Sequence, residues 1–219
     1  MMIMILWENS QEVNIMKNEI SIFGAGGYAK EAYEIISSSN QFSVKNFVVS
    51  DDHYSSKIFM GYPIIKQSEF SKTEANLVIA IGDCNVRKNI VKSFPKETNF
   101  KTIIHPSAVI SPSSKIGAGS IISAHAIVSI DVVIGDHAQI NFHSSIGHDC
   151  NIGDFFTACP GSRVSGSCEI GNQVFLGTNC SLKQNLSIAD NVNLGIGAVI
   201  LSDIDSKGTY FGNPARRMR

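Results

Sequence analysis

The chain has 219 residues, which is enough for one large domain or two modest ones. Its content of 43% hydrophobic and 17% charged residues is typical of a protein with a packed core and argues against disorder. The formal net charge of −1 provides no electrostatic footprint for nucleic acid or for an anionic membrane surface. The five cysteines have neither CxxC nor zinc-finger spacing, and this odd number favours reduced thiols and a cytoplasmic location.

The chain begins with MMIMIL, an apolar run that is too short to span a membrane. The run also lacks the basic region and the small-residue cleavage site of a signal peptide. We expect residues 1–18 to be a disordered or adventitious extension. Two domains are expected to follow, at residues 19–99 and 100–219.

In the first of these domains, predicted strands alternate with predicted helices. Strands are expected at 20–23, 46–49 and 77–81, with a weaker one at 62–65, and helices at 28–38 and 85–94. This order is typical of βαβ units with a parallel sheet, here a small Rossmann-like half. Ligands of such sheets bind outside the carboxyl ends of the strands, which here carry the glycine loop at 24–28, Asp51-Asp52 and Gly82.

The glycine loop fits a phosphate-binding turn. Gly24, Gly26 and Ala29 match G-x-G-x-x-A, and a carboxylate follows about 20 residues later. Backbone without Cβ can approach a phosphate at a helix N-terminus. One βαβ half offers no second half for a nicotinamide, so a nucleotide held by its phosphates is favoured over NAD. The alternative is a tight turn that binds nothing.

The second domain carries a repeat of six residues. An aliphatic residue, or Ala158 in one case, stands at every sixth position from Ile104 to Ile200. This period is typical of a parallel β-helix, in which three hexapeptides make one coil and residues 18 apart stack at about 4.8 Å. Aliphatic residues at outward positions of the early coils need a partner surface, either a neighbouring β-helix in an oligomer or the N-terminal domain. These outward residues are Ile103, Val109, Ile121, Ile127 and Val133.

The main candidates for chemistry are His148 and Asp149, at a predicted corner of the β-helix. A carboxylate beside an imidazole can raise its basicity and fix its tautomer. Gly166 follows one coil later, so its N–H is expected near the imidazole and could serve a developing oxyanion. A base, its orienting group and an oxyanion donor in one cleft are what acyl transfer to an amine or hydroxyl needs. The alternative is a corner turn with a satisfied side chain.

Other histidines favour a metal site only weakly. His125 and His143 should stack on another corner, and the spacing from His143 to His148 occurs in γ-type carbonic anhydrases. A zinc site needs three protein ligands, and the expected third position is Ser107, so no metal is expected. The remaining histidines are interpreted as surface or loop residues: His53, His105 and His137.

Cys150 and Cys168 are one coil apart at inward positions. A small apolar side chain that fills the core is the favoured interpretation of both.

Several motifs carry a resemblance to a known family. The hexapeptide repeat, INFHSSIGHDCNIGDF at 140–155, PGSRVSG at 160–166 and GNPARR at 212–217 resemble the left-handed β-helix acetyltransferases. FGAGGYAKE at 23–31, VVSDD at 48–52 and AIGDCNVRKNI at 80–90 narrow this to the sialic-acid O-acetyltransferase-like group that includes the PglD-type nucleotide-amino-sugar N-acetyltransferases. The resemblance extends from about residue 19 to the C-terminus, and the left hand of the coil is implied by it.

The resemblance implies an acetyl-CoA-dependent homotrimer with active sites between subunits, and no metal. The substrate would be a nucleotide-linked (UDP, dTDP or GDP) deoxysugar whose 4-amino group is acetylated for a bacterial surface glycan or glycoprotein such as the O-antigen of lipopolysaccharide. The resemblance assigns His148 as the general base, Asp149 as the residue that supports this base and the Gly166 amide as the group that faces the acetyl carbonyl. Positions implied to bind acetyl-CoA are Asn141, Thr157, Thr178 and Ile196, and those implied to bind the nucleotide sugar are Gly26, Gly27, Tyr28, Asp51, Asp52 and Gly82.

Two departures from the pattern leave the sugar open, because Thr157 and Tyr28 each replace a histidine of a related enzyme. An O-acetyltransferase acting on a sugar hydroxyl is the first alternative function. Weaker alternatives are a zinc hydratase of the γ-carbonic-anhydrase kind and a non-catalytic scaffold that binds sugar nucleotides.

Overall fold

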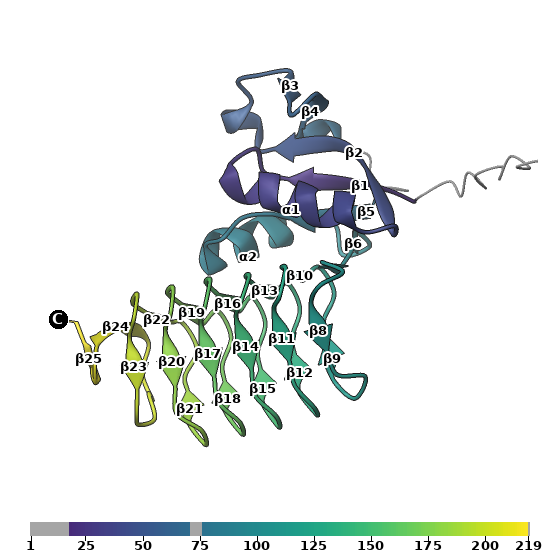
Figure 1. The fold of residues 1–219 in the computed structure, drawn as a ribbon. Helices are drawn as coiled ribbons and strands as arrows, with labels where there is room; N and C mark the ends of the chain where they lie inside the picture. The colour runs from purple at the N-terminus through teal and green to yellow at the C-terminus, as the bar shows by residue number, and fades with distance from the viewer. Residues whose placement is uncertain (1–17, 71–75, 219) are drawn as a thin grey trace, which may run out of the picture.

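The computed structural model describes residues 18–70 and 76–218. The extension expected at residues 1–18 therefore lies outside the described residues, apart from Asn18, which begins the first strand. The chain forms an α/β domain that sits on one side of a long parallel β-helix (Figure 1). The prediction of a small Rossmann-like domain followed by a left-handed β-helix is confirmed. None of the helices in the described ranges is long and apolar enough to cross a membrane.

A six-stranded sheet with the order β3-β4-β2-β1-β5-β6 forms the core of the N-terminal domain. Its strands pair in parallel, except for the antiparallel pair β3 and β4. β1 therefore lies between β2 and β5, so the loops that leave these three strands are neighbours at one edge. The elements are β1 (Asn18–Phe23), α1 (Gly27–Ser38), β2 (Phe42–Val49), β3 (Ile58–Phe59), β4 (Tyr62–Lys66), β5 (Asn76–Ile79), α2 (Cys84–Ser93) and β6 (Asn99–Phe100), with short 3-10 helices at Asp51–His53 and Gln67–Glu69.

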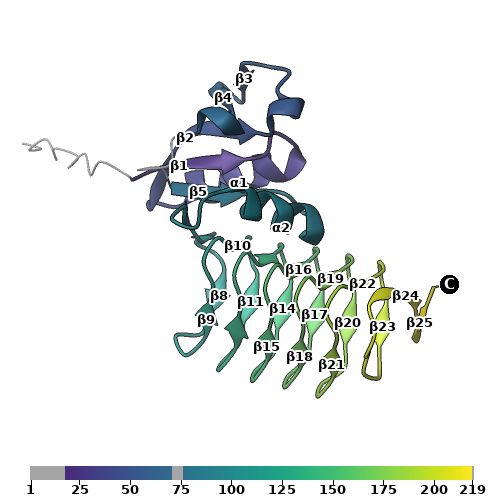
Figure 2. The same ribbon diagram turned by 180° about the vertical axis from the view of Figure 1, so that it is seen from behind.

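The two helices cover opposite faces of this sheet. Alternate strand residues point to opposite faces, so Ile20 and Ile22 of β1 pack with α1 while Phe23 packs on the side of α2. The apolar stripe of α1 at positions 29, 32, 35 and 36 is buried there. Figure 2 shows α2 between the sheet and the β-helix.

The β-helix consists of three parallel sheets of very short strands. Paired strands of neighbouring coils are offset by one coil of 18 residues, as for Ile121 with Ile103 and Gln139 with Ile121. The residues at the repeat positions, together with the small or apolar residues four positions after them, stack into one continuous apolar core from Ile122 to Ile204. The first sheet contains β7 (Ile103–Ile104), β10 (Ile121–Ile122), β13 (Gln139–Ile140), β16 (Thr157–Ala158), β19 (Phe175–Leu176) and β22 (Val192–Leu194); the second contains β8 (Val109–Ile110), β11 (Ile127–Val128), β14 (Ser145–Ile146), β17 (Arg163–Val164), β20 (Ser181–Leu182) and β23 (Val199–Ile200); the third contains β9 (Lys115–Ile116), β12 (Val133–Ile134), β15 (Asn151–Ile152), β18 (Glu169–Ile170) and β21 (Ser187–Ile188).

Four-residue turns between the sheets form three corners, which are named here. The proximal corner joins the first and second sheets, at 141–144, 159–162, 177–180 and 195–198. The distal corner joins the second and third sheets, at 147–150, 165–168 and 183–186, and is opposite the first sheet. The return corner joins the third and first sheets, at 117–120, 135–138, 153–156 and 171–174. The strands β24 (Gly208–Gly212) and β25 (Ala215–Arg217) form a hairpin that extends the first sheet at its C-terminal end.

The N-terminal domain is attached to the first sheet and the return corner by a buried arginine. Arg87 of α2 is fully buried, and its guanidinium donates to the carbonyls of Ile81 (2.7 Å) in its own domain and of His137 (3.0 Å) and Phe155 (2.9 Å) in the β-helix. Burial lowers the pKa of Arg87. Because the acceptors belong to both domains, Arg87 fixes the orientation of one domain relative to the other.

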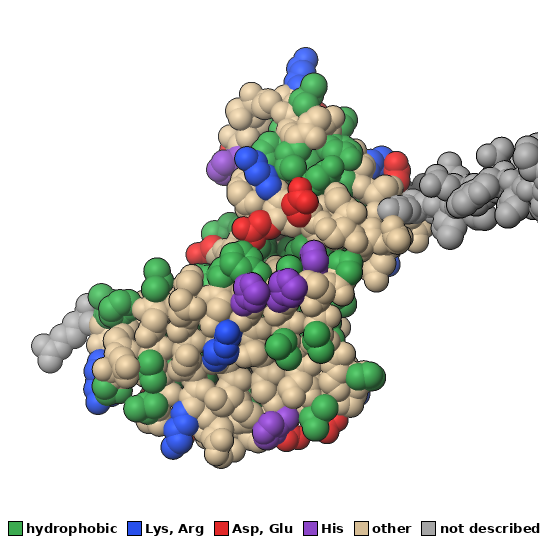
Figure 3. All heavy atoms as spheres, viewed as in Figure 1, with side chains coloured by type: hydrophobic (Ala, Val, Ile, Leu, Met, Phe, Trp, Pro, Cys, Tyr) green, Lys and Arg blue, Asp and Glu red, His purple; other side chains and the backbone are tan. Residues whose placement is uncertain are grey.

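The outward aliphatic residues of the early coils divide into two sets. Ile103 and Ile121 of the first sheet are buried against the N-terminal domain. Val109, Ile127 and Val133 of the second and third sheets are exposed, and Figure 3 shows hydrophobic side chains on this part of the surface. The N-terminal domain therefore covers only one side of the early coils.

His137 lies in a corner turn, in keeping with its interpretation as a loop residue, but it is not on the surface. Its side chain is buried at the return corner, 5% exposed, between Phe100 and Phe155, and its ring is stacked on Phe155 at 5.2 Å between centroids. Burial lowers the pKa of His137 to about 4. The periodicity gave no sign of this, because the N-terminal domain and not the repeat buries the residue.

Candidate active site

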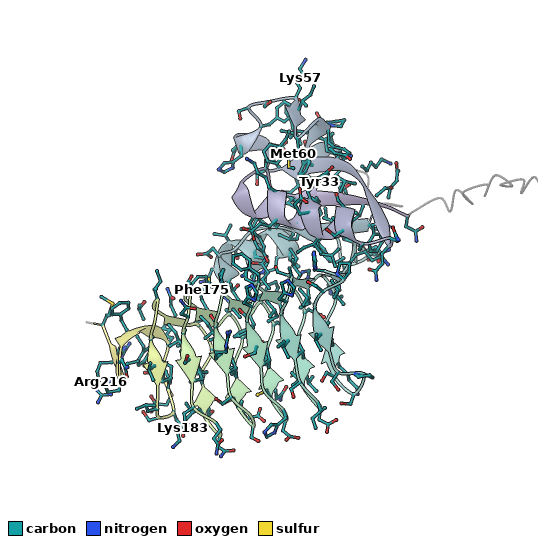
Figure 4. The ribbon with its side chains drawn as sticks, viewed as in Figure 1. Tyr33, Lys57, Met60, Phe175, Lys183 and Arg216 are labelled. Carbon is teal, nitrogen blue, oxygen red and sulfur yellow. The ribbon has the colours of Figure 1, made fainter. Side chains whose placement is uncertain are left out.

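The residues predicted to form the site lie in two groups on opposite sides of the β-helix. The proposed base and its neighbours are at the distal corner, and the other group lies where the N-terminal domain meets the first sheet and the proximal corner. Figure 4 marks both sides, with Phe175 beneath the N-terminal domain and Lys183 at the distal corner. Within one chain, the structure does not bring the two groups together.

His148 and Asp149 form a hydrogen-bonded pair at the tip of the distal corner between β14 and β15. The distance from Nδ1 of His148 to Oδ2 of Asp149 is 2.7 Å, and both side chains are more than half exposed. Asp149 has the left-handed φ of +57° that this corner position requires, a conformation that aspartate tolerates better than most residues. With Nδ1 directed to the carboxylate, Nε2 of the neutral imidazole is left as a proton acceptor.

The imidazole lies over Gly166, one coil further along the corner. A Cβ on Gly166 would be 2.6 Å from both Nε2 and Cε1 of His148, so only glycine leaves room for the ring in this position. Gly147 plays a related part that the motifs of the sequence did not reveal. A Cβ on Gly147 would be 2.6 Å from the amide nitrogen of Gly166, so the absence of that Cβ keeps the space beside this nitrogen open.

The Gly166 amide has no acceptor among the described residues, in contrast to amides in the same position of the return corner. There, each amide donates to a carboxylate or carboxamide one coil further on: Ala118 to Asp136 (2.8 Å), Asp136 to Asp154 (2.9 Å), Asp154 to Asn172 (2.9 Å) and Asn172 to Asp190 (2.7 Å). The residue one coil after Gly166 is Gln184, whose side chain makes no such bond in the described part of the chain. The distal corner thus combines an imidazole with an unused N–H.

The second group surrounds a cavity of about 600 Å³ between the N-terminal domain and the β-helix, which is named here the crook cavity. Its wall contains Tyr28, Gly82, Asn141 and Thr157 of the predicted site. Among the described residues that line it there is no lysine or arginine, and the two charged ones are Glu31 and Asp83. Neutral side-chain amides, which can both donate and accept hydrogen bonds, dominate the polar wall instead. They are Asn85, Gln139, Asn141, Gln173, Asn191 and Asn193.

Three of the predicted residues in this wall already have defined surroundings. Asn141 is buried and donates from Nδ2 to the carbonyl of Ala158 (2.9 Å). Thr157 is 1% exposed, and its hydroxyl accepts from Arg87 (2.9 Å), so its role toward acetyl-CoA stays a prediction. The Tyr28 hydroxyl is buried without a hydrogen-bond partner in the described residues, and burial raises its pKa.

The glycine loop and the aspartates lie at the neighbouring carboxyl ends of β1 and β2. Gly26 caps α1 without a side-chain hydrogen bond and Gly27 begins the helix, and a Cβ at either position would meet no described atom within 4 Å. Asp51 accepts from the Ser68 amide (3.1 Å), and hydrogen bonds from Ser68 lower the pKa of Asp51. Asp51 and Asp52 are exposed and lie outside the wall of the crook cavity.

The remaining positions implied for acetyl-CoA continue along the proximal corner. Thr178 and Ile196 follow the crook cavity toward the C-terminal end, and Ile196 is the most exposed large hydrophobic residue of the described chain, at 69%. They stand one coil apart and therefore present one continuous edge.

His125 and His143 stack on the proximal corner as expected, with ring centroids 5.2 Å apart and an angle of 12°. His148 is on a different corner, so the spacing from His143 to His148 does not place the two in one site of a single chain. The described residues contain no cluster of three or more metal-binding side chains. Figure 3 shows histidine side chains gathered below the N-terminal domain.

Comparisons with known proteins agree with this architecture. Residues 19–94 match the family model of the PglD N-terminal domain. A GDP-perosamine N-acetyltransferase from Escherichia coli O157:H7 is 29% identical over 217 residues, which cover 92% of this chain and 97% of the relative.

Solved structures extend the similarity to the whole fold. The acetyltransferase domain of PglB from Neisseria gonorrhoeae FA1090 superposes with a TM-score of 0.85 at 29% identity, covering 92% of this chain and 100% of that domain, and it has also been solved with acetyl coenzyme A. PerB from Caulobacter crescentus, in complex with CoA and GDP-perosamine, superposes with a TM-score of 0.82 at 27% identity and covers 93% and 98% of the two chains.

The family model covers the N-terminal domain alone, whereas the relatives and the solved structures span both domains in the same order. The fold of the whole chain fits the same group. The chain is therefore an acetyltransferase that is similar over nearly its whole length to nucleotide-amino-sugar N-acetyltransferases, and its residues 19–94 match the PglD N-terminal domain.

Proposed function

We propose that this enzyme transfers an acetyl group from acetyl-CoA to the 4-amino group of a nucleotide-linked deoxysugar. The relatives that act on GDP-perosamine support this acceptor class, and the structures that contain acetyl-CoA or CoA support the donor. A GDP-linked amino sugar is the first acceptor to test. A cytoplasmic location and a product used in a bacterial surface glycan or glycoprotein belong to the same proposal.

The observation that carries the proposal is the arrangement at the distal corner. Nε2 of His148 is free because Nδ1 is held by Asp149 at 2.7 Å, and the same ring lies directly over Gly166. An imidazole base beside an amide that has no acceptor within residues 18–70 and 76–218 suits attack on a thioester carbonyl, where a proton must leave and an oxyanion must be stabilised.

In the proposed reaction, the neutral amine attacks the thioester carbonyl carbon and forms the new C–N bond. His148 accepts the proton from the attacking nitrogen, and Asp149 stabilises the resulting imidazolium. The Gly166 N–H donates to the carbonyl oxygen as it becomes negatively charged. When the C–S bond breaks, the imidazolium returns the proton to the departing thiolate of coenzyme A, which balances the reaction without an acyl-enzyme.

Two cysteines, Cys84 and Cys159, line the crook cavity, and Cys159 does not suit a covalent intermediate. Burial raises the pKa of Cys159 to about 11, so this thiol remains protonated near neutral pH. The proposed direct transfer needs no nucleophile from the protein.

The separation of the two groups supports a site shared between subunits. The crook cavity faces the first sheet, and His148 is at the corner opposite that sheet. Exposed aliphatic side chains surround the distal corner, including Ile130, which stacks below His148, and Val133. Such residues need a partner surface. We propose a cyclic homo-oligomer, in keeping with the expected trimer, in which one subunit supplies His148 and Gly166 and another supplies the crook cavity.

The test is release of free thiol from acetyl-CoA with a panel of GDP-, UDP- and dTDP-linked 4-amino sugars. Mass spectrometry of the product confirms transfer, and the matching 4-hydroxy sugars test for O-acetylation. We expect one amino sugar to be acetylated and His148→Ala to lower kcat by about 10²- to 10⁴-fold with an unchanged melting temperature. Failure of every amino sugar, or near-normal turnover by His148→Ala, would refute the proposal; acetylation of the hydroxyl sugars alone would establish the alternative acceptor.

A further inference from the structure

The corners of the β-helix contain a repeated hydrogen bond from a small side chain to a backbone carbonyl. The donor is the last residue of a corner, or Thr102 at the start, and the acceptor lies 15 residues further along, in the next coil. Buried carbonyls need such partners because no water reaches them. Serine or threonine makes the bond in four cases: Thr102 to Gly117 (2.8 Å), Ser114 to Ser129 (2.5 Å), Ser144 to Cys159 (2.9 Å) and Ser162 to Gly177 (3.0 Å).

At the distal corner the same bond is made by two cysteines. Cys150 donates from Sγ to the carbonyl of Ser165 (3.2 Å), and Cys168 donates to the carbonyl of Lys183 (3.3 Å). Both thiols are buried. Their interpretation as core-filling residues is therefore incomplete, because each also holds a backbone carbonyl.

The acceptor of Cys150 belongs to the peptide unit that ends in the Gly166 N–H. We propose that Cys150 is a positioning residue for catalysis, whose thiol holds the Ser165–Gly166 peptide plane so that the Gly166 N–H points to the thioester oxygen. This inference rests on the proposed function, since it assigns an orienting group to the proposed oxyanion donor.

Two physical effects connect the thiol to the N–H. The peptide unit is planar, so holding the Ser165 carbonyl also sets the direction of the Gly166 N–H on the opposite side of the plane. A hydrogen bond to the carbonyl also polarises the amide and makes its N–H a stronger donor. The oxyanion hole gains from both, because its donors act by being oriented before the charge develops.

The direction of the Cys150 hydrogen bond follows from its surroundings. The amide of Cys168 donates to Sγ of Cys150 (3.5 Å), which occupies the acceptor side of the sulfur. The thiol proton is then left for the Ser165 carbonyl. The neighbouring Cys168 side chain and burial both raise the pKa of Cys150, so this thiol stays protonated and able to donate.

Cys168 provides the matched control. It is an equally buried cysteine that donates to a carbonyl 15 residues further along, but that acceptor is the Lys183 carbonyl, which is one coil beyond the proposed site; the contact with Cys150 lowers the pKa of Cys168 to about 6, so the control is matched in geometry and not in acidity. Cys168 also contacts the Gly166 carbonyl at 3.8 Å. That oxygen keeps a donor without Cys168, because the Asn185 amide donates to it at 3.0 Å. Cys168→Ala thus removes an equal volume and an equal bond without freeing the Ser165–Gly166 peptide.

The experiment compares Cys150→Ala, Cys150→Ser and Cys168→Ala for kcat, KM for acetyl-CoA and melting temperature. We expect Cys150→Ala to lower kcat about tenfold with KM within twofold, a smaller loss than the 10²- to 10³-fold cost of removing an oxyanion donor. Cys150→Ser should keep kcat within about twofold, because serine makes this bond at other corners. Cys168→Ala should lower the melting temperature as much as Cys150→Ala does, yet keep kcat.

Normal kcat in Cys150→Ala, an equal loss in Cys168→Ala, or no rescue by serine overturns the inference. A second measurement does not depend on the reaction: the ¹H–¹⁵N amide signal of Gly166, in protein labelled with ¹⁵N-glycine, should shift in Cys150→Ala and stay in place in Cys168→Ala. An unmoved signal in Cys150→Ala refutes the positioning role even if the wild type acetylates no amino sugar. Absence of all acetyl transfer with a shifted signal refutes the proposed function alone.

Discussion

Replacement of Gly166 by alanine tests whether the imidazole must lie over this residue. Gly166 does not have a left-handed φ, so alanine introduces no backbone strain there. Its new Cβ would meet Nε2 and Cε1 of His148 at 2.6 Å and Cδ2 at 3.0 Å. All three atoms belong to an exposed side chain, so the ring and not the backbone moves.

The displacement sets the expected size of the effect. Ordinary van der Waals contact begins at 3.4 Å, so a Cβ at 2.6 Å requires the ring to retreat by the difference of about 0.8 Å. Misplacement of a catalytic group by 1 Å can cost about 100-fold in rate. Gly166→Ala should therefore lower kcat by about two powers of ten, while the free energy of unfolding changes by no more than about 0.5 kcal/mol because the ring can turn into solvent.

Gly147→Ala is the contrasting variant at the same corner. Its Cβ would meet backbone atoms, the Gly166 nitrogen at 2.6 Å and the Ser165 carbonyl carbon at 2.8 Å, which cannot retreat without separating two coils. Gly147→Ala should thus lower both kcat and the melting temperature. Steady-state kinetics and thermal unfolding of the two variants separate the effects. If Gly166→Ala keeps kcat within threefold, or loses as much thermal stability as Gly147→Ala, the reasoning about the ring is refuted.

Three further predictions concern the rest of the chain. The unfolded chain protonates an imidazole near pH 6.5, whereas folded His137 does so only near pH 4, so stability is complete above pH 6.5 and falls by up to roughly 3 kcal/mol between these values. His137→Phe should make the free energy of unfolding less dependent on pH, as measured by urea titrations at several pH values. Phenylalanine suits the position because Phe155 has the same left-handed conformation. If the free energy of unfolding of the variant depends on pH as in the wild type, His137 is not the cause of the dependence. Arg87→Met leaves buried carbonyls without a hydrogen-bond donor, which costs about 1–3 kcal/mol for each carbonyl. Urea titration should therefore show that the free energy of unfolding falls by at least roughly 3 kcal/mol. Arg87→Lys should not restore this stability, because lysine has fewer donors than arginine. Ile127→Asp places a charge on the exposed face of the second sheet and should yield monomers without acetyl transfer in light scattering and thiol-release assays; an unchanged mass and activity would contradict the shared site.

The six-residue period made the β-helix predictable because it depends on local sequence alone. An inward residue recurs at every sixth position, so the repeat by itself assigns Ile122 and Ile140 to the core, where both are buried. The same period placed Gly166 one coil from His148, and the structure has the imidazole over that glycine. A short-range pattern was enough to predict contacts wherever residues that are neighbours in space are a fixed number of residues apart in the sequence.

Contacts between the domains follow no such rule. From the sequence alone, Arg87 would be interpreted as an ordinary surface arginine of a short helix. Its hydrogen-bond acceptors in the β-helix are 50 to 70 residues away in the sequence. The burial of His137 could not be predicted for the same reason, and for Ile103 the sequence left open whether the N-terminal domain or another subunit covers it. The crook cavity with its wall of side-chain amides also arises at this junction, so most of its residues, such as Gln139 and Gln173, could not be predicted.

The position of this junction along the β-helix bears on the proposed shared site. The crook cavity is lined at the proximal corner by Asn141 and Cys159, which belong to the same two coils as His148 and Gly166. A rotation axis parallel to the β-helix keeps every residue at its own height, so it would bring the distal corner of one subunit beside the crook cavity of the next without any shift along the axis. An end-to-end arrangement of subunits along this axis would move the imidazole of one subunit away from the crook cavity of the next by the length of the domain. Because Arg87 fixes the N-terminal domain at the height of these coils, the same residue that orients the two domains within a chain also sets the level at which two subunits would meet.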